Sequence, residues 1–173
     1  METIEKCLKE WNPTIEALGQ GKQTILIRGY HTANKEFLLY PTTNYFLKED
    51  YINGFQEKYQ SFVEKYKMPK KEDKKIEIKY YAKVEKIIEK PSSKIGYLKK
   101  HYIWTSKHVR SYLNGKIPLM WILRVYELNE PVMVNPAIGI RFAHLKNGIK
   151  TKNSKVVISD EEFLKRIHDL ETV

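Results

Sequence analysis

The sequence predicts an α+β fold in which a small, mostly antiparallel β-barrel or strongly curved sheet carries flanking helices. Two observations support this prediction. At least five segments have the apolar or alternating pattern of strands, and few helical segments lie between them. Parallel βαβ winding would instead place a helix between successive strands. The length of 173 residues suits a single domain, residues 1–173, with a core of ordinary size.

The first predicted elements lead into a turn with two glycines. Residues 4–10 are predicted to form a short helix. Asn12-Pro13 begins a second helix that ends at Leu18, because asparagine caps helices and proline suits their first turn. Gly19 and Gly21 are expected to supply the positive φ angles of a tight passage from helix to strand.

Two strands are predicted after this turn, at residues 24–28 and 36–40. The first is rich in β-branched residues and ends in a charge, Arg28. Pro41 is expected to stop the second strand, because proline cannot donate to the ladder. A polar turn of six or seven residues separates the two strands, so the sequence predicts a hairpin.

Aromatic residues recur every three or four positions between residues 50 and 66, at positions 51, 55, 59, 62 and 66. This spacing predicts an amphipathic helix whose aromatic stripe packs into the core. Residues 67–75 follow with mixed charges and Pro69, which predicts an exposed charged loop.

The clearest strand begins at residue 75, where apolar and charged residues alternate through residue 85. Ile87 and Ile88 are adjacent and break the alternation, so a bulge or strand end is expected near Lys86. The remaining predicted elements are a helix at 106–113 ending at Asn114-Gly115, a central strand at 117–128, a short strand at 156–158 and a helix opened by Ser159 or Asp160.

Several functional classes lack their sequence signals. No apolar run approaches the ~20 residues of a membrane span, and the start has no secretory pattern. The single cysteine, Cys7, leaves no internal disulfide and suits a reducing compartment, so we expect a cytoplasmic protein with no membrane partner. The five histidines are scattered and no phosphate-binding loop occurs, so no metal and no cofactor are expected.

The net charge of +10 is concentrated in one quarter of the chain. Residues 67–110 hold 14 Lys and Arg against 5 Asp and Glu. Such a block favours a polyanionic partner, either nucleic acid or an acidic membrane surface. A generally lysine-rich composition, as in a thermophile, is the alternative, because 26 of the 31 basic residues are lysine.

Arg28 is the leading candidate for a binding residue. A charge at the end of a buried strand either binds a phosphate or carboxylate beside a groove or has a buried partner. Arginine beside aromatic rings suits a phosphate and a stacked base. The predicted nucleic-acid-binding residues are Lys22, Arg28, Tyr30, His31, Lys79, Lys83, His101, Trp104 and Arg124. The alternative is that the rings pack structurally and Arg124 pairs with a buried acid.

Two further function classes stay open. Glu77-Ile78-Lys79 has the E-x-K spacing of restriction-type nucleases, in which the acid and an upstream Asp, here Asp50 or Asp73, hold Mg²⁺ and the lysine lies near the attacking water. Catalytic roles for Glu77 and Lys79 are therefore an alternative, although this spacing arises easily in a strand rich in Lys and Glu. The other class is an accessory domain that binds a protein partner.

Many segments resemble a prokaryotic family known as domain of unknown function 1802. The matching stretches are Glu10-Trp11, residues 15–18, 21–23, Leu26, Arg28-Gly29, 37–42, 101–105, Pro118-Leu119, 123–126 and 157–163. Residues 138–145 depart from the pattern, with Phe142 where a tryptophan is expected. The resemblance implies no assigned activity. Some members are joined to restriction-endonuclease domains, which suggests a role near DNA, a link to restriction or defence systems and a possible restriction-endonuclease partner.

A more distant resemblance is to ASCH and PUA-like barrels, whose signature is close to G-x-K-T-x-E-x-R. Gly21, Thr24 and Arg28 match it, whereas Gln23 and Leu26 replace its lysine and glutamate. The resemblance implies a barrel that binds RNA or modified bases. We therefore expect a non-enzymatic module that binds nucleic acid, either RNA or DNA, the DNA with or without modified bases.

Overall fold

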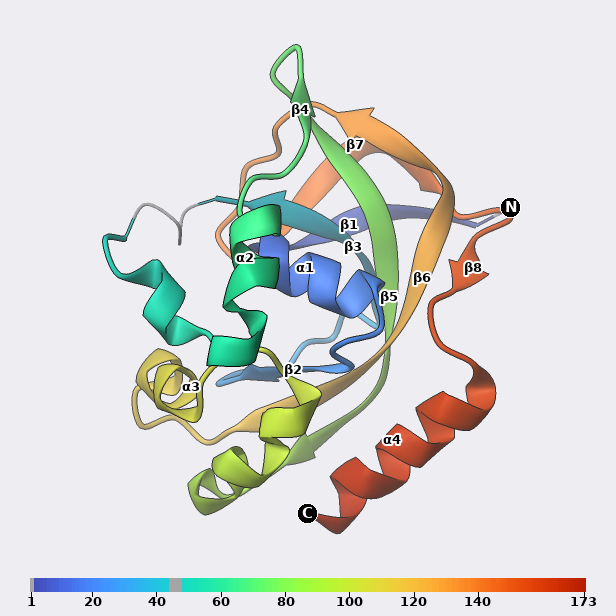
Figure 1. Ribbon diagram of the computed structural model, residues 1–173. Coiled ribbons are helices and arrows are strands. Elements are labelled where there is room, and N and C mark those ends of the chain that lie inside the picture. The colour runs from blue at the N-terminus through green and yellow to red at the C-terminus, as the bar shows by residue number, and fades with distance from the viewer. Residues whose placement is uncertain (1, 44–47) are drawn as a thin grey trace.

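The strands of the protein form one curved sheet. A computed structural model describes residues 2–43 and 48–173. The eight strands of these residues have the order β2-β6-β5-β3-β1-β7, with β4 added to β5 and β8 added to β6 (Figure 1). They are β1 (Thr3–Trp11), β2 (Ile25–Arg28), β3 (Glu36–Thr42), β4 (Lys71–Glu72), β5 (Lys75–Glu89), β6 (Leu119–Val134), β7 (Phe142–Lys150) and β8 (Lys155–Val156).

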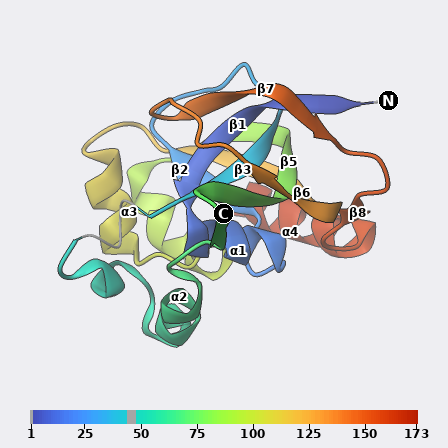
Figure 2. The same cartoon turned by 90° about the horizontal axis from the view of Figure 1, so that it is seen from above.

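Helices flank this sheet (Figures 1 and 2). The α-helices are α1 (Asn12–Gly19), α2 (Gln60–Tyr66), α3 (Ser106–Leu113) and α4 (Asp160–Thr172), and the 3-10 helices are η2 (Tyr51–Gly54), η3 (Glu57–Tyr59) and η4 (Ser92–His101). Only the β1–β3 pair is parallel among the strand pairs of the described residues. The predicted α+β class, with a mostly antiparallel, strongly curved sheet and flanking helices, is confirmed.

Two long strands produce the curvature. β5 and β6 pair along most of their length and bend together across the molecule (Figure 1). Their register shifts between Ile78 and Tyr80 and again between Val84 and Lys86. Bulges bend a strand and increase its twist, so these two irregularities curve the sheet. The second lies at the bulge predicted from the broken alternation near Lys86.

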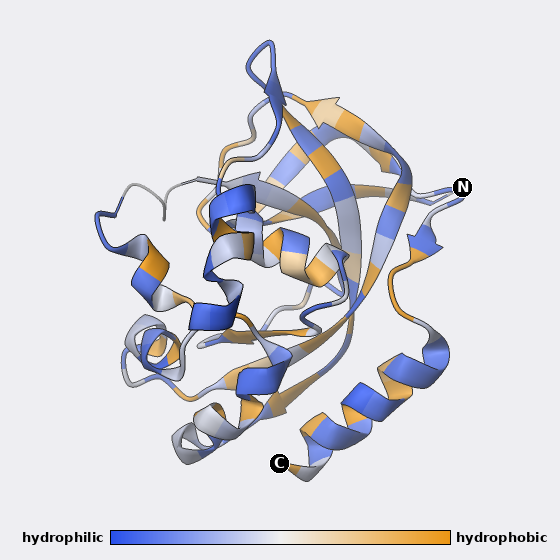
Figure 3. Cartoon of the chain, in the orientation of Figure 1, coloured by the Kyte–Doolittle hydropathy of each residue, from blue (hydrophilic) through white to orange (hydrophobic). Residues whose placement is uncertain are grey.

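The two faces of the sheet have separate cores. Alternation along β6 places Trp121 and Leu123 on the inner face and Met120 and Ile122 on the outer face. The inner cluster receives side chains from β1, β2, β3, β5 and β6 and from α1, so it fills the space that the sheet encloses. The outer cluster packs beneath η4, α3 and α4. Along β5 the same alternation appears as hydrophilic and hydrophobic bands in Figure 3.

The predicted helix at residues 4–10 is wrong, because this segment lies in β1. Ile4 and Cys7 are three residues apart and belong to one buried cluster. This spacing puts both residues on one face of a helix, whereas a regular strand would put them on opposite faces. A register shift between Ile4 and Lys6 reverses the alternation and explains the spacing. Strand pairing with β3 and β7 on both sides outweighs the local pattern, and Cys7 is fully buried.

The predicted hairpin between residues 24–28 and 36–40 is also wrong. β2 pairs with β6, whereas β3 pairs with β1 and β5, so the polar turn is a crossover between strands that are not neighbours. Pro41 does not end β3, which continues to Thr42. β5 pairs with β3 only as far as Leu38, so Pro41 has no ladder to interrupt on that side.

The helix predicted at residues 50–66 is divided into η2, η3 and α2. The chain is extended at Phe55, which forms an isolated bridge with Trp104. The Gln56 side chain then donates to the carbonyl oxygens of Lys99, Tyr102 and Trp104, so this position serves tertiary contacts that a continuous helix would break. Residues 67–75 are largely exposed and include the short strand β4.

The remaining helices begin and end close to the predicted residues. α1 and α3 lie close to the predicted ranges, and the Ser159 hydroxyl caps α4. The predicted Asn12 cap is wrong: Trp11 is the N-cap of α1, and the Asn12 side chain instead donates to the Tyr66 carbonyl oxygen. Gly21 has φ 74°, as its turn requires. Gly19 serves a different purpose, because a Cβ there would lie 2.2 Å from the Tyr80 ring. Among the described residues, no helix has the length and apolar character to cross a membrane.

Candidate functional site

The sheet does not close, and its two ends meet at a seam. β2 and β7 are the end strands, and the described residues contain no backbone ladder between β2 and either β1 or β7. β7 pairs with β1 only as far as Leu8, so the end of β1 at Glu10 also faces this seam.

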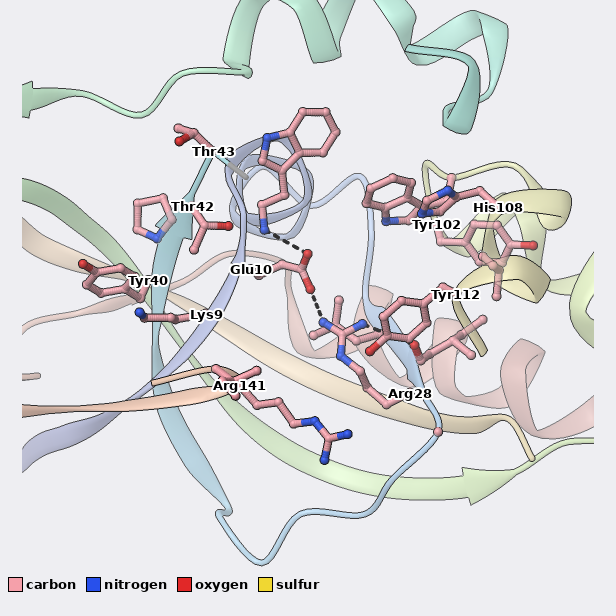
Figure 4. Close-up of a pocket in the computed structure, with 18 of the residues that line it drawn as sticks. Lys9, Glu10, Arg28, Tyr40, Thr42, Thr43, Tyr102, His108, Tyr112 and Arg141 are labelled. Atoms are coloured by element: carbon pink, nitrogen blue, oxygen red, sulfur yellow. Dashed lines mark hydrogen bonds and ion pairs between the residues drawn. The ribbon is translucent and has the colours of Figure 1, made fainter. Parts of the chain in front are cut away.

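Alternation aims two opposite charges into the seam. Leu8 and Leu26 lie in the inner cluster, and the next inward positions on their strands are Glu10 and Arg28. The Arg28 Nη2 donates to Glu10 Oε2 in an ion pair that joins β1 to β2 (Figure 4). A second contact joins the ends of the sheet at Tyr30, whose ring centroid lies 3.8 Å from the guanidinium carbon of Arg141.

A cleft of about 1000 Å³ opens along this seam. Its walls come from the ends of β1, β2 and β3, from α3, from the β4 hairpin and from the loop before β7 (Figure 4). We call it the seam cleft. Its walls include the charged, aromatic and exposed apolar residues Lys9, Glu10, Arg28, Tyr30, Lys48, Lys71, Trp104, His108, Tyr112, Lys116, Ile140 and Arg141.

Positive charge dominates the described walls of the seam cleft, which hold six Lys or Arg side chains and one carboxylate. The Arg28–Glu10 pair is neutral as a unit, which leaves the excess on Lys9, Lys48, Lys71, Lys116 and Arg141. Burial lowers the pKa of His108 to about 4, and Lys48 contributes to the decrease, so this imidazole is neutral at neutral pH. The cleft is therefore suited to an anion.

Arg28 itself is a buried structural partner as well as a cleft residue. It is only 8% exposed, and its Nη1 also donates to the Ile27 carbonyl oxygen at 3.2 Å. Burial by itself would lower the pKa of Arg28, but the nearby Glu10 carboxylate more than offsets this effect and raises the pKa. Of the two alternatives for this arginine, the buried ion pair is the one observed.

Aromatic rings form the other component of the seam cleft. Trp104 stacks on Phe55 at 4.1 Å and on His108 at 4.2 Å, with both rings nearly parallel to the indole. Two such rings cannot share one face, so each covers one face of Trp104. Tyr112 is 50% exposed at the edge of the cleft. Its ring centroid lies 5.5 Å from the guanidinium carbon of Arg28. Its ring is better placed to meet a ligand than that of Trp104.

Three of the nine predicted binding residues line the seam cleft: Arg28, Tyr30 and Trp104. The other six lie outside it. Lys22 and His101 line a separate small pocket, and His31 is exposed beyond the cleft wall.

The other three predicted binding residues make contacts of their own. Lys79 Nζ lies 2.5 Å from Glu16 Oε1, and Lys83 Nζ lies over the Tyr126 ring. Arg124 donates to Asp160 Oδ1 at 2.7 Å and to the Ile158 carbonyl oxygen at 2.9 Å. The Arg124 contacts match the structural alternative, except that Asp160 is an exposed acid.

The residues of the nuclease alternative also lie outside the seam cleft. Glu77 Oε2 is 3.9 Å from Lys70 Nζ, and Lys79 pairs with Glu16. In residues 2–43 and 48–173, no three His, Cys, Asp or Glu side chains form a group suited to a metal ion, and this includes Glu77 with Asp50 or Asp73.

Sequence reasoning missed Lys9, Glu10, Tyr112, Lys116 and Arg141. The helix predicted at residues 4–10 concealed the inward position of Glu10 on a strand. One signal was available, because Glu10-Trp11 is among the stretches that match the family pattern. Arg141 carried no such signal, since it lies in the region that departs from the pattern.

The fold and the cleft define an α+β domain with a basic, aromatic-lined seam in a curved sheet. The family described as "Domain of unknown function (DUF1802)" matches residues 7–169, and the chain belongs to it. No curated protein matches the chain.

Solved structures similar to this chain include an ASCH protein from Zymomonas mobilis, with 15% identity and a TM-score of 0.46 over 95% of this chain and 94% of that one. A serine-to-alanine variant of that protein gives 13% identity and a TM-score of 0.47, over 96% of this chain and 95% of that one. A tyrosine-to-phenylalanine variant gives 14% identity and a TM-score of 0.46, over 95% of this chain and 96% of that one.

Proposed function

We propose that this protein is a non-enzymatic module that binds a single-stranded segment of nucleic acid in the seam cleft. One observation carries the proposal: the same walls hold an excess of cations and a set of aromatic rings. Phosphates require cations, and unstacked bases require aromatic faces. A cleft of about 1000 Å³ has room for a ligand of nucleotide size.

The cations have different roles in this proposal. Lys9, Lys116 and Arg141 contact phosphates, because they line the cleft at its accessible edge. Tyr112 offers its half-exposed ring to a base. The Arg28–Glu10 pair lies deeper, where the carboxylate can accept hydrogen bonds from the amino or imino groups of a base edge.

Salt dependence tests the proposal. Fluorescence anisotropy with a single-stranded RNA oligomer, a DNA oligomer of the same sequence and the corresponding duplexes gives affinities at several salt concentrations. Log affinity for a single strand is expected to fall linearly with log salt, with a slope of about −0.7 per phosphate contact. Arg141→Gln should reduce the slope by about one such contact and weaken binding, while the unfolding temperature reports that the fold is intact.

Lys155→Gln is the matched control, because Lys155 is exposed on β8 and lies outside the cleft. This variant should retain the slope of the wild type. Absence of salt-dependent binding to every oligomer would overturn the proposal, as would equal effects of the two substitutions.

The family resemblance adds a cellular role and a partner to the proposal. A link to restriction or defence, with a restriction endonuclease as partner in the cytoplasm, follows from the resemblance of the sequence. Affinity for DNA oligomers with and without modified bases tests this link, and co-purification with a restriction endonuclease tests the partner. Equal affinity for all bases and no co-purification would remove this extension and leave the binding module.

A further inference from the structure

A second pocket, of about 250 Å³, lies between α4 and the segments that contain Lys22-Gln23-Thr24 and Lys100-His101. None of its described lining residues also lines the seam cleft. Its described walls contain no Phe, Tyr or Trp, in contrast to the aromatic walls of the cleft. It therefore lacks the surface on which a base would stack.

Four cations surround this pocket, and one of them is held rigidly. Arg166 donates from Nε to Glu162 Oε1 at 3.0 Å and from Nη1 to Thr24 Oγ1 at 2.7 Å. These two bonds orient the planar guanidinium, and its side chain stays 22% exposed to a ligand. A fixed guanidinium is well suited to bind the oxygens of a phosphate.

The remaining charges leave the pocket positive. Lys100 Nζ is 3.6 Å from Asp169 Oδ2, so this pair and the Arg166–Glu162 pair are each neutral. Lys22 and Lys165 line the same pocket and have no ion pair within the described part of the chain. The net charge of about two positive units matches a phosphate dianion.

His101 supplies an independent observation. The residue is 6% exposed, and its buried Nε2 has no hydrogen-bond partner among the described residues. An unsatisfied buried polar atom is costly and therefore rare in folded proteins. Burial lowers the pKa of His101, and Lys100 adds to the decrease, so the ring is neutral and can donate from Nε2. Nε2 is inaccessible in this conformation, so a bound anion would provide the missing acceptor after the imidazole, which lines the pocket, turns toward it.

We infer that this pocket binds a phosphate group. The source is either a free phosphate compound or the backbone of a strand whose bases occupy the seam cleft, and the latter rests on the proposed function. The two sites are close in the chain: Gln23 and Tyr102 line the cleft, while their neighbours Lys22, Thr24 and His101 line the pocket. The two sites thus lie along the same two segments.

The experiment is a titration of the full chain with inorganic phosphate, followed by NMR, against sodium chloride of equal ionic strength. Phosphate is expected to shift the His101 imidazole and Arg166 Nε signals saturably and to raise the unfolding temperature. Arg166→Gln should abolish the shift of His101. Because that variant also loses contacts to Glu162 and Thr24, Lys165→Gln is the second variant. Lys165 is exposed and forms no ion pair with a described residue, so its loss should weaken phosphate binding by about two- to fivefold without affecting the fold.

The controls separate this inference from the proposed function. Arg141→Gln, in the seam cleft, should leave the phosphate-induced shifts of His101 and Arg166 unchanged, because Arg141 does not line this pocket. If Lys165→Gln also lowers the salt dependence of oligonucleotide binding, the phosphate comes from the bound strand; if it affects inorganic phosphate alone, the ligand is a free phosphate compound. Shifts that phosphate and chloride produce equally, or that Lys165→Gln and Arg166→Gln leave intact, would overturn the inference even if the cleft binds nucleic acid.

Discussion

The carboxylate of Glu10 on β1 is paired with the guanidinium of Arg28 on β2, although the two strands share no backbone ladder in the described structure. Each residue lies at the end of its strand, on the face that points into the curved sheet. The sheet is therefore joined at this point by side chains instead of by peptide groups. Strands joined only by side chains lie farther apart than strands in a ladder, and the seam cleft is the space between them.

Glu10→Gln should destabilise the protein by about 3 kcal/mol, because it leaves the buried Arg28 guanidinium without a counter-charge. Urea unfolding measures the change in the free energy of unfolding. The double variant Glu10→Leu with Arg28→Met should recover most of this loss, since replacing both charges leaves neither unpaired.

Lys86→Gln is the control for that prediction. Lys86 pairs with Glu171 at 3.2 Å, and both side chains are more than 40% exposed. Its loss should change stability by less than about 0.5 kcal/mol. An equally small effect of Glu10→Gln would mean that the Arg28 pair does not stabilise the seam.

Gly19→Ala should cost about 1–3 kcal/mol, the usual range for overpacking a core. The Tyr80 ring lies against Gly19 where the new methyl group would be, and the Tyr80 hydroxyl donates to Glu16 Oε2 at 3.3 Å, which limits its movement. Thermal unfolding reports the change. Gly96→Ala is the matched control, because its nearest atom would be 3.9 Å away. Similar effects of the two substitutions would contradict the packing explanation.

Stability should decrease as the pH falls from about 6.5 to about 4, partly because of His108. Its pKa is lowered from the ordinary 6.5 to about 4 in the folded protein, by burial first and Lys48 second. Below pH 6.5 the unfolded chain therefore binds a proton that the folded chain does not, which favours unfolding. Chemical unfolding at several pH values should show a shallower decrease for His108→Gln.

The decrease should not vanish in that variant, because burial also lowers the pKa of His101. The double variant His101→Gln with His108→Gln should be flatter still between pH 6.5 and 4. Identical pH profiles for the wild type and His108→Gln would show that His108 titrates normally.

Ile140→Ser should weaken oligonucleotide binding without lowering stability. Ile140 is 96% exposed and lines the seam cleft, so it contributes nothing to the core and is free to contact a base. Anisotropy should show a loss of about fivefold, which corresponds to ~1 kcal/mol of apolar contact. Leu164→Ser is the control, since Leu164 is 65% exposed on α4 and outside the cleft. Unchanged affinity would exclude Ile140 from the interface.

Local pattern predicted elements well wherever the local signal and the tertiary contacts agreed. The alternation of β5, the N-cap of α4 and the turn after α1 were all visible in neighbouring residues. β1 was missed because a bulge gave a strand the spacing of a helix. The segment 50–66 was missed because Phe55 and Gln56 make contacts with residues 99–104, which a local pattern does not contain.

The candidate site was predictable only in part, since a site depends on which strands are neighbours. Arg28, Tyr30 and Trp104 were chosen by residue type and line the cleft, but Lys79, Lys83 and Arg124 were grouped with them on the assumption of one common face. Strand order instead brings Arg141 to Tyr30 and Glu10 to Arg28.

The sequence alone determined the α+β class, the positive charge and the inward alternation that puts a guanidinium at the end of β2. Tertiary structure decided the partner of that guanidinium and the position of the cleft. The physical reason is range: alternation, caps and turns act over a few residues, whereas an ion pair or a cleft wall requires segments far apart in the chain to lie at one seam. Which segments meet there depends on the burial and pairing of the whole sheet.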